Sequence, residues 1–110
     1  MVAQKIVDEK IYYYGKLYHV HPKKVFIRNQ STRWGSCSTR GNLSFNFRLI
    51  YLPEPLLNYL IAHEVCHLRE MNHSERFWGL VAKTIPDFKK RKAALREASR
   101  RSFNNINTPD

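Results

Sequence analysis

The stretch LLNYLIAHEVCHLREMNHSERFW, residues 56–78, contains the pattern that decides the fold and the chemistry of this chain. Within it, His63-Glu64-Val65-Cys66-His67 forms a complete H-E-x-x-H motif. Four residues turn a helix by about 400°, so the two imidazoles share one helix face and lie about 6 Å apart along its axis. Such a pair can hold one zinc ion, while Glu64 can reach a metal-held water as a general base. The stretch therefore predicts a metal-binding helix.

A zinc site of this kind needs a third protein ligand and leaves its fourth position to water. Glu70 shares the helix face, but it lies seven residues from His63, about 10.5 Å along the axis, which is too far. His73 is better placed, because Asn72 can take the left-handed conformation that ends a helix and turns the chain back toward the metal. Glu97, on a later predicted helix, is the second candidate for the third ligand.

Hydrophobic periodicity predicts further elements before this helix. Residues 3–20 carry apolar side chains at spacings of three and four, which predicts an amphipathic helix. Apolar and alternating runs across residues 25–50, with turn residues at 39–42, predict an antiparallel ribbon of two or three short strands. Pro53-Glu54-Pro55 can open the metal-binding helix, which should run to about Met71.

Two helices are predicted after the metal-binding helix. One begins near Ser74 and is interrupted at Pro86, and a basic helix then runs to about Arg100. The expected fold is α+β, with an N-terminal helix, a small antiparallel β-ribbon or sheet, the active-site helix, and one or two further helices. Residues 1–102 are expected to form a single domain, followed by residues 103–110 as a tail without helical or strand period.

The composition is that of one small globular domain. Of the 110 residues, 43% are hydrophobic and 25% are charged, which excludes a disordered or collagen-like chain. No apolar run approaches the roughly 20 residues of a membrane span, and no signal-peptide pattern is present, so we expect a cytoplasmic protein with no membrane partner. The two cysteines, Cys37 and Cys66, are too few for a disulfide scaffold and are expected to be thiols.

Positive charge is in excess, with 19 Lys and Arg against 9 Asp and Glu and a formal net charge of +10. Seven of the cations lie between Asp87 and Arg101. Such an excess favours phosphate-rich or acidic partners, nucleic acid among them. Two alternatives to a peptidase therefore stay open: a zinc-dependent phosphoester or nucleotide hydrolase, and a nucleic-acid-binding module with a structural zinc. Structural zinc usually recruits more cysteine than two separated thiols can supply.

Three motifs together carry a resemblance to a known family: HEVCHLREMNHSERFW at residues 63–78, the segment RWGSCS at residues 33–38, and Ile85-Pro86-Asp87. They resemble the YgjP-like metal-dependent hydrolases and are similar to the very small zincin peptidases called minigluzincins, and more distantly to SprT-like proteases. The resemblance implies a zinc metallopeptidase that acts on a peptide or protein substrate. Its implied ligands for Zn²⁺ are His63, His67 and His73.

The resemblance also implies how the site works and how it is controlled. Glu64 would act as the catalytic base. Similar minimal peptidases are expected to be held inactive by their C-terminal segments, within one chain or by exchange between two chains. Residues 103–110 are therefore a candidate latency segment, and a homodimer is a candidate state of the protein.

The residues of the RWGSCS segment also predict a structural and cleft-forming role. Gly35 permits close approach of the backbone, and Trp34 can lie against the active-site helix. An edge strand here would offer unpaired backbone groups to an extended peptide. Asn46, on the polar face of the next strand, could hydrogen-bond a substrate amide. Cys66 is expected to be a buried thiol, while Cys37 could approach the zinc if the ribbon crosses the site.

Overall fold

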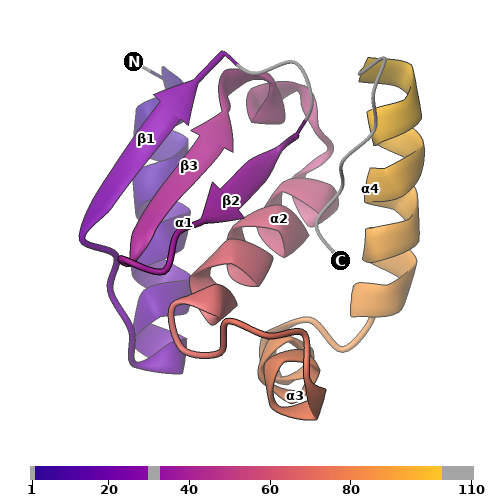
Figure 1. The fold of residues 1–110 in the computed structure, drawn as a ribbon. Coiled ribbons are helices and arrows are strands. Elements are labelled where there is room, and N and C mark those ends of the chain that lie inside the picture. The colour runs from indigo at the N-terminus through magenta and orange to yellow at the C-terminus, as the bar shows by residue number, and fades with distance from the viewer. Residues whose placement is uncertain (1, 30–32, 103–110) are drawn as a thin grey trace.

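The computed structural model describes residues 2–29 and 33–102, and Figure 1 shows its helices around a three-stranded sheet. In chain order the elements are α1 (Val2–Tyr18), β1 (Lys24–Arg28), β2 (Gly35–Cys37), β3 (Asn42–Asn46), the 3-10 helix η1 (Phe47–Tyr51), α2 (Glu54–His67), α3 (Glu75–Thr84) and α4 (Phe88–Ser102). The expected α+β class is confirmed, as are the N-terminal helix and both helices after the metal-binding helix.

Helix α2 is the central element of the fold. It packs against α1, α3, α4 and β2, and eleven of its 14 residues are buried. A helix that is apolar on nearly every side must be covered on every side. Pro55 stands in its first turn, where a missing N–H costs no hydrogen bond. The helix ends at His67, four residues before the predicted end at Met71, so its last turn carries the H-E-x-x-H motif.

The sheet has the order β1-β3-β2, and its strands are not all antiparallel. Strands β2 and β3 form the expected hairpin, with Gly41 at a φ of 86° in the turn. Strand β1 instead pairs in parallel with β3, with Val25 opposite Leu43. The expectation of an antiparallel ribbon is therefore wrong for β1. Strand β2 follows β1 in the sequence but lies at the opposite edge of the sheet, and β3 then lies between them. Short apolar runs predict strands but do not show their direction.

The hydrophobic core lies between the sheet, α1 and α2. Leu43 and Phe45 alternate toward it from β3, and neither is exposed to solvent. Trp34, just before β2, is also buried, and its indole N–H donates to Ser99 Oγ at 2.7 Å, which ties this end of β2 to α4. The apolar face of α1 follows its predicted spacing and is buried at Val7, Ile11, Tyr14 and Tyr18.

Asn46 has a structural role in place of the predicted substrate contact. Its side chain is fully buried, its Oδ1 accepts from the Arg48 N–H at 3.0 Å, and its Nδ2 donates to Arg33 O at 3.2 Å. The first bond caps η1, and the second holds the segment before β2. The expectation that Asn46 is offered to substrate is wrong, because the strand ends at this residue and the side chain serves the turn that follows.

Within residues 2–29 and 33–102, no helix combines the length and the apolar character needed to cross a membrane. The candidate latency segment, residues 103–110, lies outside the described residues.

Candidate metal centre

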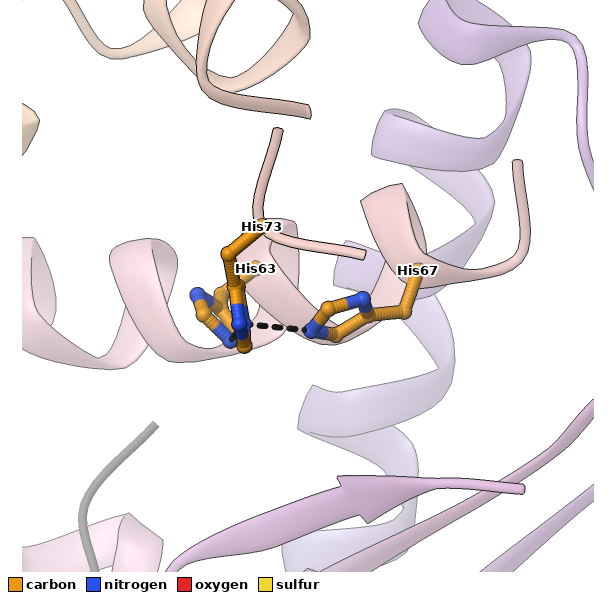
Figure 2. Close-up of side chains that lie close together, drawn as sticks. All are labelled: His63, His67 and His73. Carbon is orange, nitrogen blue, oxygen red and sulfur yellow. Dashed lines mark hydrogen bonds between the residues drawn. The ribbon is translucent and has the colours of Figure 1, made fainter. Parts of the chain in front are cut away.

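Three histidine side chains converge at the C-terminal end of α2. His63 and His67 lie one helical turn apart and are buried, with 1% and 8% of their surfaces exposed, whereas the exposed His73 comes from the loop between α2 and α3. Figure 2 shows the three rings directed at one point. The Nε2 atom of His73 lies 3.0 Å from Nε2 of His67 and 3.5 Å from Nε2 of His63. The structure thus brings together the three predicted ligands.

The spacing of these nitrogens fits a zinc ion. Tetrahedral zinc with Zn–N bonds of about 2.0–2.1 Å sets neighbouring nitrogens about 3.3 Å apart. The two measured separations, 3.0 and 3.5 Å, lie on either side of that value, and one ligand atom from each histidine falls within 4.8 Å of the others. Three imidazoles and an open fourth position are the donor set of many catalytic zinc sites.

The surroundings of His67 and His63 orient the two rings for metal binding. The Nδ1 of His67 lies 3.0 Å from the carbonyl oxygen of Glu70, and a carbonyl only accepts, so the proton is on Nδ1. In the neutral ring, Nε2 then carries the lone pair that binds a metal. The Nδ1 of His63 lies 3.4 Å from the hydroxyl of the buried Tyr59, which can donate or accept, so this contact helps to position the ring without fixing its tautomer.

Phe77, from the first turns of α3, holds the three rings in place. It is fully buried, and its ring centroid lies 5.0 Å from that of His63, 4.4 Å from that of His67 and 4.9 Å from that of His73. Aromatic pairs at these separations are favourable in both stacked and edge-to-face arrangements. The NHSxxFW part of the quoted stretch therefore supplies one histidine of the cluster and, four residues later, an aromatic ring that packs against all three histidines.

Both buried histidines are held in the neutral form that binds metals. Burial lowers the pKa of His63 well below its usual value, and the neighbouring His67, His73 and Lys92 lower it further. Burial also lowers the pKa of His67, although the hydrogen bond to Glu70 opposes this effect. A metal ligand must be unprotonated, so the site favours the state that can coordinate an ion at neutral pH.

Glu64 follows His63 in α2, and its side chain faces β2. It is only 3% exposed, and burial raises its pKa to about 8, while the charge of Arg33 acts in the opposite direction. A divalent cation at the histidines would favour the charged carboxylate. Cys37 also lies near Glu64, since burial and then this carboxyl group raise the pKa of the thiol to about 11. Glu64 is thus enclosed by the segment that begins at Arg33.

The remaining candidates from the sequence lie outside the histidine cluster. Glu97 pairs with Arg100 at 3.1 Å and is half exposed, so its proposal as the third ligand is wrong. Cys37 does not belong to the cluster, and its Sγ donates to Ser38 O at 3.5 Å. Cys66 is buried as expected, and burial is the main cause that raises its pKa to about 12.

The loop that delivers His73 does not use a left-handed residue at Asn72. Among the described residues, the non-glycine residue with a positive φ is His19, at 59°. The N–H groups of Arg69 and Glu70 instead both donate to the carbonyl of Cys66, at 3.0 and 2.9 Å, and turn the chain. The expectation for Asn72 is wrong because tightened turns of this kind can end a helix without a left-handed residue.

Lys92 is a neighbour of the site that the sequence analysis missed. Its charge acts on His63, and its ammonium lies 4.9 Å from the ring centroid of Trp78, which stacks against His73. A sequence pattern does point to this residue, because the spacing of Lys89, Lys92 and Arg96 places the three cations on one face of α4. The charge of this helix predicts a solvated surface or one for phosphate-rich or acidic partners, and it does not by itself place a cation at the site.

Replacing Gly35 by alanine should destabilise the fold at the contact between β2 and Glu64. A Cβ at this position would lie 3.1 Å from Cδ1 of Phe45, 3.2 Å from the carbonyl oxygen of Ser44 and 3.4 Å from Cγ of Glu64. Backbone and core atoms cannot move away freely, so we expect the free energy of unfolding to fall by about 1–3 kcal/mol. Urea denaturation of the variant measures this loss.

Gly79→Ala is the matched control for this substitution. A Cβ at Gly79 in α3 would meet nothing within 4 Å, and alanine there should stabilise the helix by about 0.5–1 kcal/mol. A Gly35→Ala protein as stable as the parent would show that the strand and the helix are not in the close contact described.

The chain is similar to known metallopeptidases. The model of the YgjP-like metallopeptidase domain family matches residues 1–98, which include the three histidines, Glu64 and all three strands. A similar solved structure is the metallopeptidase zymogen of Pyrococcus abyssi abylysin, with a TM-score of 0.76 and 21% sequence identity, covering 88% of this chain and 98% of that one. No curated protein matches the sequence. The family match confirms the resemblance that the sequence motifs indicated.

Proposed function

Because the chain belongs to the YgjP-like metallopeptidase domain family, we propose that it hydrolyses peptide bonds with a zinc ion held by His63, His67 and His73. Glu64 is the general base in this proposal. The observation that carries it is the convergence of three imidazole Nε2 atoms, two of them 3.0 and 3.5 Å from the third, beside a buried carboxyl group.

In the proposed mechanism, the zinc ion and the side chains of the protein have separate roles. When bound, a zinc ion supplies a Lewis acid for the scissile carbonyl and lowers the pKa of a water molecule toward about 7. His67 keeps its Nε2 lone pair directed at the centre because its Nδ1–H donates to Glu70 O. Glu64 takes a proton from the attacking water and passes it to the leaving amine.

Strand β2 supports the binding of an extended peptide beside the metal centre. It lies at one edge of the sheet, and among the described residues it pairs with β3 alone. The other side of the strand can therefore offer its backbone N–H and C=O groups to a further strand. Gly35 of β2 faces the side chain of Glu64, so a peptide added along this edge would pass the general base.

The make-up of the histidine cluster favours an enzyme over a module with structural zinc. In the part of the chain that the structure describes, the cluster consists of His63, His67 and His73, and no cysteine or carboxylate joins it. Structural zinc sites are usually closed by four protein ligands, whereas catalytic sites keep one position for water or substrate.

We extend the proposal to latency, with residues 103–110 as the inhibitory segment. Its support is the sequence resemblance together with the similar abylysin structure, which is that of a zymogen. In this proposal the segment covers the cleft of its own chain or, by exchange in a homodimer, that of a second chain.

The full chain and a chain that ends at residue 102 should be assayed side by side on casein, short peptides and nucleotides, with zinc and after chelation. We expect cleavage of casein or peptides that chelation abolishes, a higher rate for the shorter chain, and no turnover of nucleotides. Turnover of nucleotides alone would support the phosphoester alternative, and cleavage that persists in metal-free protein would contradict the zinc mechanism. Equal rates for the two chains would remove residues 103–110 from the proposal.

A further inference from the structure

A cavity of about 700 Å³ opens beside the metal centre, between α4 and the start of α3. Figure 1 shows α3 next to the N-terminal end of α4. The proposed ligand His73 forms part of the cavity wall, so a substrate held at the metal could extend into it. The other lining residues used here are Trp78, Phe88, Lys89, Lys92 and Arg96.

The wall of the cavity is continuous from the metal centre to α4. Trp78 stacks against His73 with ring centroids 5.8 Å apart, and it stacks against Phe88 with centroids 5.0 Å apart. These rings make an apolar wall that leads away from the histidines and fixes the distance between the metal centre and α4. A group that entered the cavity would therefore lie at a defined position relative to the metal.

The residues that line the cavity carry more positive than negative charge. Lys89, Lys92 and Arg96 contribute three cations, and Glu75 is the single carboxylate among the residues that line the cavity. Within the described residues, neither Lys89 nor Lys92 has a carboxylate within ion-pair distance. Three other cations of α4 are paired, since Arg91 binds Asp87, and Arg100 and Arg101 bind Glu97.

Lys92 is the cation best placed to act on a bound group. Its side chain is half-buried, and its Nζ lies 4.9 Å from the ring centroid of Trp78 in a cation–π contact. Such a contact restricts the ammonium and leaves it with fewer waters, and an ion in this state attracts an opposite charge more strongly than a fully hydrated lysine. Lys90, two residues away, lies on the exposed side of the same helix.

We propose that this cavity is a substrate subsite that accepts the side chain of an aspartate or glutamate in the peptide, with Lys92 as the residue that selects it. This inference rests on the proposed peptidase function and adds a substrate class to it: peptides with an acidic residue close to the scissile bond. The carboxylate of such a residue would pair with the ammonium of Lys92 beside the aromatic residues that line the cavity.

A nucleic acid fits the same cavity less well. Binding of single strands normally uses aromatic rings with a free face on which bases stack. The ring of Trp78 already contacts His73 and Phe88 in stacked arrangements and carries Lys92 above it. A carboxylate needs no free ring face, since it binds to the ammonium group.

Binding to a catalytically inert protein tests the subsite independently of turnover. The Glu64→Gln protein loaded with zinc, both as the full chain and as a chain that ends at residue 102, is titrated with a series of ten-residue peptides, each carrying one glutamate at a different position, and with the matching glutamine peptides. Isothermal titration calorimetry gives each Kd. We expect one or two neighbouring positions at which glutamate binds about tenfold more tightly than glutamine.

Two lysine variants locate the effect. Lys92→Met should abolish the preference for glutamate while keeping the binding of the glutamine peptides. Lys90→Met removes the same charge from the exposed side of α4 and should leave the preference unchanged. The tryptophan emission should change when the preferred peptide binds, because Trp78 lines the cavity whereas Trp34 is buried.

Several results would overturn the inference. These are equal Kd values for glutamate and glutamine peptides, absence of peptide binding, an equal effect of both lysine variants, or a single-stranded oligonucleotide that binds more tightly than every peptide and depends on Lys92. The failure of the proposed function is distinguishable from these results. A glutamate preference in a protein that cleaves no peptide contradicts only the catalysis, and cleavage without the preference contradicts only the subsite.

Discussion

Glu64→Gln is expected to lower kcat for peptide hydrolysis by about a thousandfold while the protein keeps its metal and its fold. A general base contributes roughly 10²–10⁴ to a rate, and glutamine cannot accept the proton of the attacking water. The metal should stay because the candidate ligand cluster of three histidines does not include Glu64. Stability should change little, because glutamine has the size of glutamate and brings no charge into a site where only 3% of the side chain is exposed.

Glu70→Gln is the control for this substitution. Glu70 follows α2, and its contact with the site is through its backbone carbonyl, which a side-chain change leaves in place. Kinetics on a peptide substrate and zinc content by mass spectrometry should be measured for both variants. A Glu64→Gln enzyme with the turnover of the parent protein would remove Glu64 from the mechanism, and an equal loss in Glu70→Gln would show that the effect is not specific to the base.

His63→Ala should remove zinc binding and, with it, the stabilisation that zinc gives the fold. Ligand bound only to the folded state stabilises it by RT ln(1 + [L]/Kd), about 4 kcal/mol when free zinc is a thousandfold above Kd. For a domain of 110 residues this raises the melting temperature by roughly 15 °C or more. The measured quantity is the difference between melting temperatures with zinc and with a chelator, which should be large in the parent protein and close to zero in the variant.

The difference between the melting temperatures with zinc and with chelator separates two effects on stability: the loss of zinc binding, and the cavity that alanine leaves in the core. His21→Ala serves as the control, because His21 is exposed and belongs to no ligand cluster among the described residues. It should retain the full zinc-dependent shift. If His63→Ala kept that shift too, His63 would not be a ligand.

The helical part of the candidate site could be predicted from the sequence because it depends on local geometry. His63 and His67 share a face in any α-helix, whatever the rest of the chain does. His73 could also be predicted, since a short connection before α3 keeps it near the end of α2. The path of the backbone from the end of α2 to His73 could not be predicted, because the residues around Asn72 permit several hydrogen-bonding patterns that end a helix.

The parts that could not be predicted depend on contacts between distant segments. The alternation Leu43-Ser44-Phe45 indicates a strand, but only the path of the chain between β1 and β2 decides that β1 lies parallel to β3. The position of Lys92 depends in the same way on how α4 packs against α2 and α3. Its spacing with Lys89 and Arg96 defined a common face, and no local pattern states which neighbour that face meets.

The three proposed ligands differ in how firmly the fold holds their side chains. This difference decides which of them loses its contact with the metal ion first. His63 and His67 belong to the most enclosed helix, whereas His73 stands on a surface connection. Departure of the ion would begin with a brief excursion of that connection, which costs far less free energy than opening the interior. The residence time of the metal should therefore respond to changes at the exposed positions of this connection, Met71, Asn72 and Ser74, more than the stability of the fold does.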